Sequence, residues 1–359
     1  MLNNEGLIKN GILLMTVLPP PEGGIATWTK HYLEYCNNNN IKVNIVNMTL
    51  VGKRKDNISN MRRSFRDEYK RTKNIFTELN KSLNKQKYGL VHYNSSCSKY
   101  GIIRDFIMIR KIHKYNLPIV FECHCNLERE LKTKVKRVFF SLIAKNVDLI
   151  LVLNSKSEYL AKCLTSKKVI ITPNFININS IDSDRVIQSE LKNIVYVGHI
   201  QREKGSFELI EAAKHFKDIK FTLVGPVCSD IDVEKCPGNL IFEGEKTPEE
   251  VKSYLQRADV FVFPSHTEGF SLSLLEAMAS GLPVVATDVG ANPDMIESYG
   301  GFLCAPKSAK GLISGIDKIK DQNIRKQMSR WNTEKVQNFY TVEMVLNKIF
   351  DEYKKIMKK

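Results

Sequence analysis

The chain has no apolar run approaching the roughly 20 residues that a membrane-spanning helix needs. Its first ten residues lack the basic region and cleavage pattern of a signal peptide. The eight cysteines form no CxxC pair, and no complete G-x-G-x-x-G is present. These absences argue against a membrane span, a secretory leader and a dinucleotide-binding fingerprint, and they predict free thiols in a reducing cytosol.

Metal-ligand patterns are also scarce. Cys123, His124 and Cys125 form the one dense cluster, but alternation along a strand would send His124 to the opposite side from the two thiols. The D-x-D triplets at 182–184 and 230–232 are expected to be turn or surface acids. We therefore expect no essential metal.

The length of 359 residues and a hydrophobic content of 43% are typical of a globular protein with two domains. Short buried strands alternate with helical stretches in both halves, which predicts an α/β protein with doubly wound parallel sheets. The expected strands are 12–18, 41–47, 88–93, 118–124 and 147–153, then 194–197, 220–224, 240–242, 260–263, 283–286 and 301–304. A polar stretch near 174–190 separates the two sets, and 331–359 is predicted to be helical.

The net charge of +15 belongs entirely to the first half. Residues 1–180 hold 30 Lys and Arg against 13 Asp and Glu, whereas residues 181–359 hold 24 against 26. Such basic runs, here 53–73 and 132–137, are either solvated faces or surfaces that dock on anionic lipid, where each basic residue contributes about 1 kcal/mol. Because only Phe65 and Tyr69 are interleaved with the first run, we expect no nucleic-acid partner.

The segment 264–290, PSHTEGFSLSLLEAMASGLPVVATDVG, is the most informative in the chain. It follows a buried strand and begins a helix near Ser271, so free N–H groups at the helix start would lie where open α/β sheets bind phosphate. A carboxylate is unfavourable beside a phosphate, so Glu268 is expected to accept hydrogen bonds from ligand hydroxyls, and Glu276 to reach a second pair such as a ribose diol. The alternative is that both are solvated carboxylates near a helix start.

The spacing of Glu268 and Glu276, within this context, resembles the E-x7-E motif of the retaining glycosyltransferases of family GT4. The resemblance implies that Glu268 contacts the hydroxyls of the donor sugar and Glu276 the ribose. It also assigns the diphosphate to the backbone of 270–272, which is Phe270, Ser271 and Leu272.

A second loop, GHIQREKG at 198–205, resembles the diphosphate-binding G-R-x(n)-K-G loop of that family. Lys204 matches the lysine, but His199 stands where the family has arginine and Arg202 lies three residues later. Either His199 or Arg202 would therefore act with Lys204 on the leaving diphosphate, whose developing charge cations can stabilise without a metal. Outside this loop context, Lys204 would be an ordinary exposed residue before a helix.

Three features of the first half complete the resemblance. Gly23 and Gly24 follow the first strand, as in the family's glycine loop, where glycine lets a backbone approach a ligand closely. His124 matches a histidine that lies against the donor sugar in the family, although a lone histidine is as often structural. Asn174 occupies the family's P-N-G position and is expected to be structural.

The resemblance implies a GT-B fold, with two Rossmann-like domains facing each other across a cleft. The expected parts are an acceptor-side domain at 1–178, a donor domain at 190–330 and a C-terminal helix at 331–359 that crosses back to the first domain. The implied activity is retaining sugar transfer, without a cofactor, from a nucleotide-sugar, UDP- or GDP-linked, to a glycan or polyprenyl-phosphate-linked acceptor in bacterial surface polysaccharide assembly. The expected location is the cytoplasm, at the inner membrane face.

Two alternatives remain open at this level. A nucleotide-sugar epimerase shares the GT-B architecture, but the intact E-x7-E context argues against it. A catalytically silent partner subunit, or an anion-binding module that uses the basic face, would lack donor turnover altogether.

Overall fold

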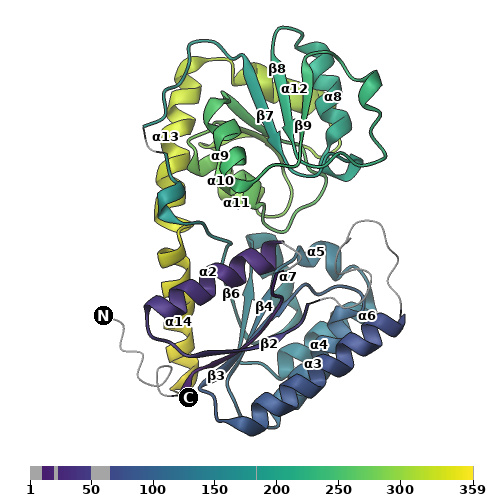
Figure 1. The fold of residues 1–359 in the computed structure, drawn as a ribbon, viewed down its shortest axis with the longest axis vertical. Coiled ribbons are helices and arrows are strands. Elements are labelled where there is room, and N and C mark those ends of the chain that lie inside the picture. The colour runs from purple at the N-terminus through teal and green to yellow at the C-terminus, as the bar shows by residue number, and fades with distance from the viewer. Residues whose placement is uncertain (1–9, 20–22, 50–64, 183, 359) are drawn as a thin grey trace. The chain divides into compact units, whose positions relative to one another are not determined.

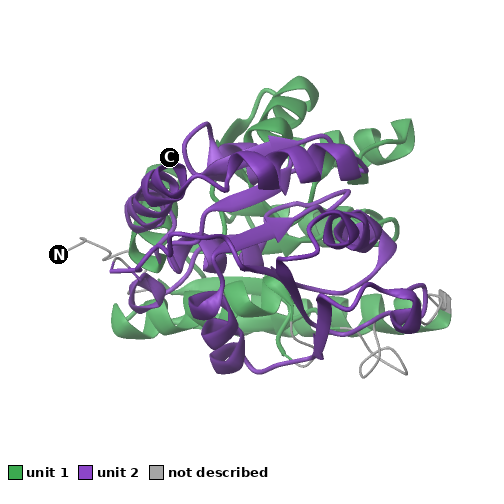
Figure 2. Ribbon diagram, turned by 90° about the horizontal axis from the view of Figure 1, so that it is seen from above, with its two compact units in different colours: residues 1–174, 342–359 green, residues 175–341 purple. Residues whose placement is uncertain are grey.

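The computed structural model describes residues 10–19, 23–49, 65–182 and 184–358. The chain forms two compact units, unit 1 from residues 1–174 with 342–359 and unit 2 from residues 175–341 (Figure 2). Part of the predicted basic run, residues 53–55 and 62–63, lies outside the described residues. Within the described ranges, no helix has the length and apolar character required to cross a membrane.

Unit 1 is built on a six-stranded parallel sheet in the order β2-β1-β3-β4-β5-β6 (Figure 1). Its strands are β1 (Ile12–Thr16), β2 (Val43–Asn47), β3 (Leu90–Ser95), β4 (Ile119–Cys123), β5 (Leu149–Val152) and β6 (Lys168–Ile171). Its helices are α2 (Gly24–Asn38), α3 (Phe65–Lys85), α4 (Gly101–His113), α5 (Leu127–Glu130), α6 (Lys134–Lys145), α7 (Ser155–Leu164) and α14 (Val342–Met357). The edge strand β6 was not predicted.

Unit 2 carries a second six-stranded parallel sheet in the order β12-β11-β10-β7-β8-β9. Its strands are β7 (Asn193–Val197), β8 (Lys220–Val224), β9 (Leu240–Gly244), β10 (Val260–Phe263), β11 (Val284–Thr287) and β12 (Gly301–Cys304). Its helices are α8 (Ser206–His215), α9 (Pro248–Arg257), α10 (Leu272–Ala279), α11 (Asn292–Ile296), α12 (Ala309–Lys318) and α13 (Gln322–Phe339). All six strands predicted for this half are present.

The strand order of each sheet predicts where that sheet binds a ligand. The order reverses between β1 and β3 in unit 1 and between β7 and β10 in unit 2. Open parallel sheets bind ligands outside the carboxyl ends of their strands at such a reversal. The loops 198–205 and 264–271, which follow β7 and β10, therefore lie at the binding position of unit 2.

The structure divides the chain at other residues than the sequence suggested. The predicted boundaries were 178 and 331, whereas the units divide after Asn174 and after Thr341. The C-terminal stretch, expected as one helix from 331, is two helices, because α13 ends at Phe339 and α14 begins at Val342. Figure 1 shows α14 beside α2, and the two helices are in contact.

The sheet of unit 1 has two differently lined faces. Alternate residues of a strand point to opposite sides, and Val91, Tyr93 and Phe121 join the apolar core with α3, α4 and α6. The residues between them, His92 on β3 and Glu122 on β4, are equally buried but polar. Aromatic side chains of α2 and α14 cover this second face.

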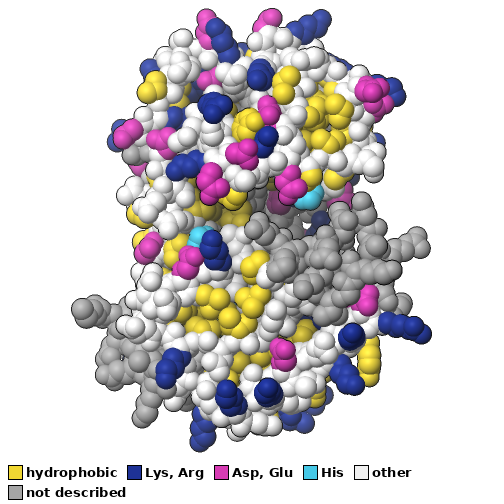
Figure 3. All heavy atoms as spheres, viewed as in Figure 1, with side chains coloured by type: hydrophobic (Ala, Val, Ile, Leu, Met, Phe, Trp, Pro, Cys, Tyr) yellow, Lys and Arg dark blue, Asp and Glu magenta, His cyan; other side chains and the backbone are white. Residues whose placement is uncertain are grey.

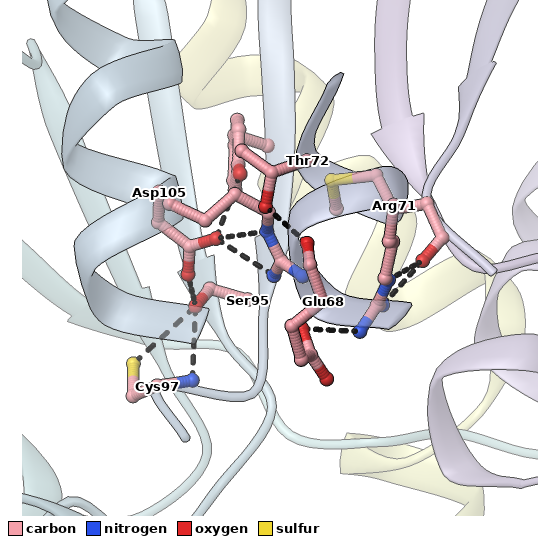
Figure 4. Close-up of polar contacts among 9 residues, drawn as sticks. Glu68, Arg71, Thr72, Ser95, Cys97 and Asp105 are labelled. Atoms are coloured by element: carbon pink, nitrogen blue, oxygen red, sulfur yellow. Dashed lines mark hydrogen bonds and ion pairs between the residues drawn. The ribbon is translucent and has the colours of Figure 1, made fainter. Parts of the chain in front are cut away.

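A buried ion pair within α4 is hydrogen-bonded to the end of β3 (Figure 4). Asp105 accepts hydrogen bonds from the Tyr93 hydroxyl at 2.8 Å, from Arg104 Nη2 at 2.8 Å and from Ser95 Oγ. The side chain of Asp105 is 0% exposed and that of Arg104 is 6% exposed. Charges removed from water in this way are tolerated only when they are paired and hydrogen-bonded.

One member of the predicted basic run is not on a solvated face. Arg71 of α3 is turned inward and its Nε donates to the carbonyl of Met48 at 2.9 Å, beside Glu68 (Figure 4). Burial, followed by the positive charge of Arg104, lowers the pKa of Arg71 to about 10. The expectation that this arginine belongs to a solvated or lipid-binding surface is therefore wrong.

Candidate functional site: the switch point of unit 2

The helix that carries the acidic motif begins and ends close to the predicted residues. Ser271 is the N-cap of α10, and its hydroxyl accepts a hydrogen bond from the Leu274 N–H at 3.2 Å. The first N–H groups of a helix have no partner within the helix, and its dipole favours anions there. Leu272, the first residue of α10, and Ser271 thus lie at a helix start suited to phosphate, with Phe270 packed against Tyr340 just before it.

Glu268 is held by one donor from the loop 198–205 and one from its own loop. Lys204 Nζ lies 2.6 Å from Glu268 Oε1, and the Ser265 hydroxyl donates to the same oxygen at 2.7 Å. The Lys204 side chain is 29% exposed and the Glu268 side chain 11%, so both stay within reach of solvent or ligand. The structure thus brings together the two residues that the sequence assigned to the diphosphate and to the sugar.

The loop between β7 and α8 fixes Lys204 by its backbone. Residues 202–204 form a short 3-10 helix that ends at Gly205, whose φ is 81°. A Cβ at Gly205 would lie 2.2 Å from the Pro264 carbonyl oxygen, so only glycine lets the two loops come this close.

His199 and Arg202 are both exposed on this loop. The guanidinium of Arg202 lies 4.1 Å from the centre of the Phe207 ring, and its backbone N–H donates to Asp230 Oδ2 at 2.8 Å. Asp230 is therefore engaged in holding the loop. The hydroxyl of Tyr196 donates to the His199 carbonyl at 2.8 Å, which leaves the His199 side chain at the surface.

Two further residues of this site were not singled out from the sequence. The backbone N–H of His266 donates to the Glu203 carbonyl at 2.9 Å, and its Nε2 lies 3.1 Å from Glu208 Oε1 on α8. Ser265 supports Glu268 as described above. Both lie inside the quoted motif, but their contacts are with residues 58 or more positions away or with their own loop. The spacing of residues in a sequence does not predict such contacts.

Glu276 lies on α10 and lines a cavity of about 350 Å³. The cavity is also lined by Pro248, Glu249 and Lys252 of α9. Its size is in the range of small-molecule pockets. Burial raises the pKa of Glu276 to about 7, and among the described residues no charged group offsets this effect of burial.

The remaining predicted residues lie in unit 1. Gly23 is the N-cap of α2, Gly24 is its first residue, and a Cβ on either would meet no atom within 4 Å. His124 follows β4, and its side chain is 3% exposed. Its Nε2 lies 3.6 Å from Glu122 Oε1. Glu122 was missed from the sequence, although alternation along β4 places it on the same face as His124.

The cysteines are all free, as expected, including Cys123 and Cys125 beside His124. Asp232 of the second D-x-D triplet pairs with Lys235 at 2.6 Å on the surface. Asn174 is buried and is the last residue of the first segment of unit 1.

Two doubly wound six-stranded parallel sheets in one chain constitute the GT-B fold. Sucrose-phosphate synthase from Thermosynechococcus elongatus superposes with a TM-score of 0.80 at 18% identity, covering 98% of this chain and 100% of that one. Residues 177–336, which make up most of unit 2, match the model of glycosyl transferases group 1.

Curated relatives agree with this assignment. A 41.2 kDa protein of the cps region of Klebsiella pneumoniae is 25% identical over 68% of this chain and 72% of its own length. The UDP-Gal:alpha-D-GlcNAc-diphosphoundecaprenol alpha-1,3-galactosyltransferase of Escherichia coli is 25% identical over 77% of each chain. The protein is thus a glycosyltransferase, and its relatives include the capsular polysaccharide biosynthesis glycosyltransferase CapM of Staphylococcus aureus, which is 26% identical over 46% of each chain.

Proposed function

We propose that the protein is a retaining GT4 hexosyltransferase that moves a sugar from a nucleotide-sugar, UDP- or GDP-linked, to a hydroxyl of a lipid-linked glycan in bacterial surface polysaccharide assembly. The observation that carries this proposal is the grouping of Lys204, Glu268 and Ser265 beside the start of α10. The Escherichia coli relative, which by its name uses UDP-Gal and a diphosphoundecaprenol-linked acceptor, supports the choice of donor and acceptor class.

In the proposed mechanism the residues of unit 2 hold the donor. The helix start at 270–272 and the cation of Lys204, with Arg202 or His199, stabilise the charge that develops on the departing diphosphate. Glu268 accepts hydrogen bonds from sugar hydroxyls, and Glu276 accepts them from the ribose. The leaving phosphate helps to deprotonate the acceptor hydroxyl on the same face of the sugar, so neither a protein nucleophile nor a metal is required.

Glu276 provides the test of the donor site. Thermal stabilisation by UDP-, GDP-, ADP- and CMP-sugars is expected for one nucleotide and is expected to disappear in Glu276→Ala. Because a ribose diol donates to the ionised carboxylate, and the pKa of the free group is about 7, the affinity of that nucleotide should be up to about tenfold lower at pH 6 than at pH 8.

The matched control is Glu211→Ala, which removes an exposed carboxylate from α8. Stabilisation that persists in Glu276→Ala would place the ribose elsewhere. No stabilisation by any nucleotide would instead support the silent-subunit alternative.

We also propose that unit 1 docks on anionic lipid through the face formed by α4 and α6. These helices pack on each other, and Val135 and Val138 of α6 are 64% and 57% exposed. Lys134 and Arg137 stand beside them at the same i, i+3 spacing and are exposed. Lys and Arg side chains also stand over the face of unit 1 that α3 covers (Figure 3). Apolar side chains framed by basic ones suit a headgroup surface.

The docking proposal is tested by binding to lipid vesicles and not by enzyme activity. The affinity for phosphatidylglycerol vesicles, measured by co-sedimentation, is expected to fall about 30-fold in a Lys134→Gln, Arg137→Gln double variant, because each of the two basic residues contributes about 1 kcal/mol near headgroups. The matched control is Lys310→Gln with Lys326→Gln, which removes two exposed cations from unit 2. Equal binding to neutral phosphatidylcholine, or an equal loss in the control, would contradict this face.

A further inference from the structure

Two ionisable side chains of unit 2 lie beside the donor loops and have no part in the proposed mechanism. Glu208 of α8 and His266 of the loop 264–271 face each other, with His266 Nε2 3.1 Å from Glu208 Oε1. Each side chain is only 13% exposed. Glu211, one turn further along the same helix, is 55% exposed and pairs at the surface with Lys214.

The contact between Glu208 and His266 is a hydrogen bond with a defined direction. An ionised carboxylate can only accept, so Nε2 of His266 is the donor and Oε1 of Glu208 is the acceptor. The second oxygen of Glu208, Oε2, is buried, and in the part of the chain that the structure describes it has no hydrogen-bond partner. A buried carboxylate with so few donors is unfavourable by itself, so its position is expected to serve a neighbouring group.

His266 also joins the two donor loops through its backbone. Its N–H donates to the Glu203 carbonyl at 2.9 Å. Residue 266 is therefore tied to the loop 198–205 by its main chain, and to the helix that follows this loop by its ring. Glu203 precedes Lys204 directly, and His266 is two residues before Glu268. Both ties thus lie next to the Lys204–Glu268 pair.

The Lys204–Glu268 pair depends on how the two loops are held. Lys204 Nζ reaches Glu268 Oε1 at 2.6 Å through a flexible side chain with four carbons, so the backbone must keep its partner within reach. The spacing of the loops is limited at one point by the close approach of Gly205 to the Pro264 carbonyl. Two residues further along the second loop, His266 is another point at which the loops are joined.

We propose that Glu208 and His266 are positioning residues of the donor site, whose hydrogen bond holds the loop 264–271 against the loop 198–205 so that Lys204 and Glu268 meet. Neither side chain has to touch the donor for this role. The positioning concerns contacts within unit 2 alone, whereas its effect on sugar transfer rests on the proposed function.

Hydrogen exchange in the full-length, ligand-free protein tests the positioning without any turnover. The backbone amide of His266 is protected by its bond to the Glu203 carbonyl, so it reports whether the loops remain together. In Glu208→Ala we expect this amide to exchange about tenfold faster, because a hydrogen bond of ordinary net strength has been lost. Glu208→Gln retains a side-chain oxygen for the Nε2–H, so exchange should stay close to that of the wild type.

Two controls accompany this measurement. Glu211→Ala removes an exposed carboxylate from the same helix and should leave the His266 amide unchanged. The Leu274 amide, which donates to the Ser271 hydroxyl at the start of α10, is the internal reference and should keep its rate in Glu208→Ala. An unchanged His266 amide in Glu208→Ala would overturn the proposal, because the loops would then be held without the pair. Equal acceleration of both amides would also overturn it, since the change would then loosen unit 2 as a whole.

Kinetics supply the second measurement. Glu208→Ala should lower kcat by about 10- to 100-fold, with a smaller change in the KM for the donor, because a small displacement of Lys204 weakens its effect on the departing diphosphate. In a Lys204→Ala background the same substitution should lower kcat by no more than about threefold, because the group that it positions is already absent.

The outcomes of the two measurements separate the positioning from the proposed function. Equal fractional losses of kcat in both backgrounds, or an unchanged kcat in Glu208→Ala, would overturn the positioning of Lys204. Recovery of kcat in Glu208→Gln would support it. If the wild type transfers no sugar from any donor, the proposed function fails, whereas hydrogen exchange still decides whether the pair holds the loops together.

Discussion

Lys204→Ala is expected to lower kcat by about 10²- to 10³-fold, the loss typical of removing one group that stabilises developing charge. Lys204 is placed for this role by its 2.6 Å contact with Glu268 and by the closely packed loop at Gly205. A diphosphate gains charge as its bond to the sugar breaks, so a cation beside it acts more strongly in the transition state than in the bound donor. The KM for the nucleotide-sugar should therefore change much less than kcat.

Steady-state kinetics with the nucleotide identified by thermal stabilisation would measure this effect. Lys214→Ala is the matched control, because it removes a lysine of α8 that pairs only at the surface with Glu211. His199→Ala and Arg202→Ala, compared in the same assay, would show which of the two acts with Lys204. A rise in KM at unchanged kcat for Lys204→Ala would mean that Lys204 binds the donor without assisting departure of the diphosphate.

The sequence predicted the donor loops well because their signals are local. A buried strand, a loop and a capped helix follow one another in 260–279, and the helix that starts after Ser271 is present within a residue of the predicted start. The loop 198–205 likewise contains its own glycine and lysine. The pairing of Lys204 with Glu268, across 64 positions, follows from the parallel order of β7 and β10.

Other parts were missed for identifiable reasons. The edge strand β6 is only Lys168–Ile171, and its lysine and the following Thr172–Pro173 hide the apolar pattern. The break near Tyr340 that separates α13 from α14 lies within a continuous helical period. Arg71 was assigned to a basic face because its neighbours are basic, whereas burial against Met48 depends on where β2 ends.

The partners of the buried polar residues near His124 could not be predicted from the sequence either. His92 and Glu122 lie in runs of apolar residues that mark buried strands, which correctly predicts burial but not a partner. His92 is hydrogen-bonded to Tyr353 of α14 and is linked through Asn94 to Thr29 of α2. Both of these partners are far from His92 in the sequence. Only the packing of both helices on one face of the sheet shows that these groups form a connected set.

Asp105→Ala should be the most destabilising single change among the described polar groups considered above, lowering the free energy of unfolding of unit 1 by about 3–5 kcal/mol. The substitution leaves the Arg104 guanidinium buried without its carboxylate and removes the acceptor of the Tyr93 and Ser95 hydroxyls. An unpaired buried charge loses its hydration without compensation, which is the physical origin of the effect.

The two tryptophans allow this to be measured for one unit at a time. Trp28 lies in unit 1 and Trp331 in unit 2, so in a Trp331→Phe background the fluorescence follows unit 1 alone during urea unfolding. The control is Glu78→Ala, an exposed carboxylate on α3. The double change Arg104→Met with Asp105→Leu should recover the part of the lost stability that comes from the unpaired charge, because it removes both charges, whereas the Tyr93 and Ser95 hydroxyls still lack their acceptor. If Asp105→Ala cost no more than the control, the charge of Arg104 would have to reach water in the folded protein, and the hydrogen bonds that Asp105 accepts from Tyr93 and Ser95 would not be what secures α4 to the end of β3.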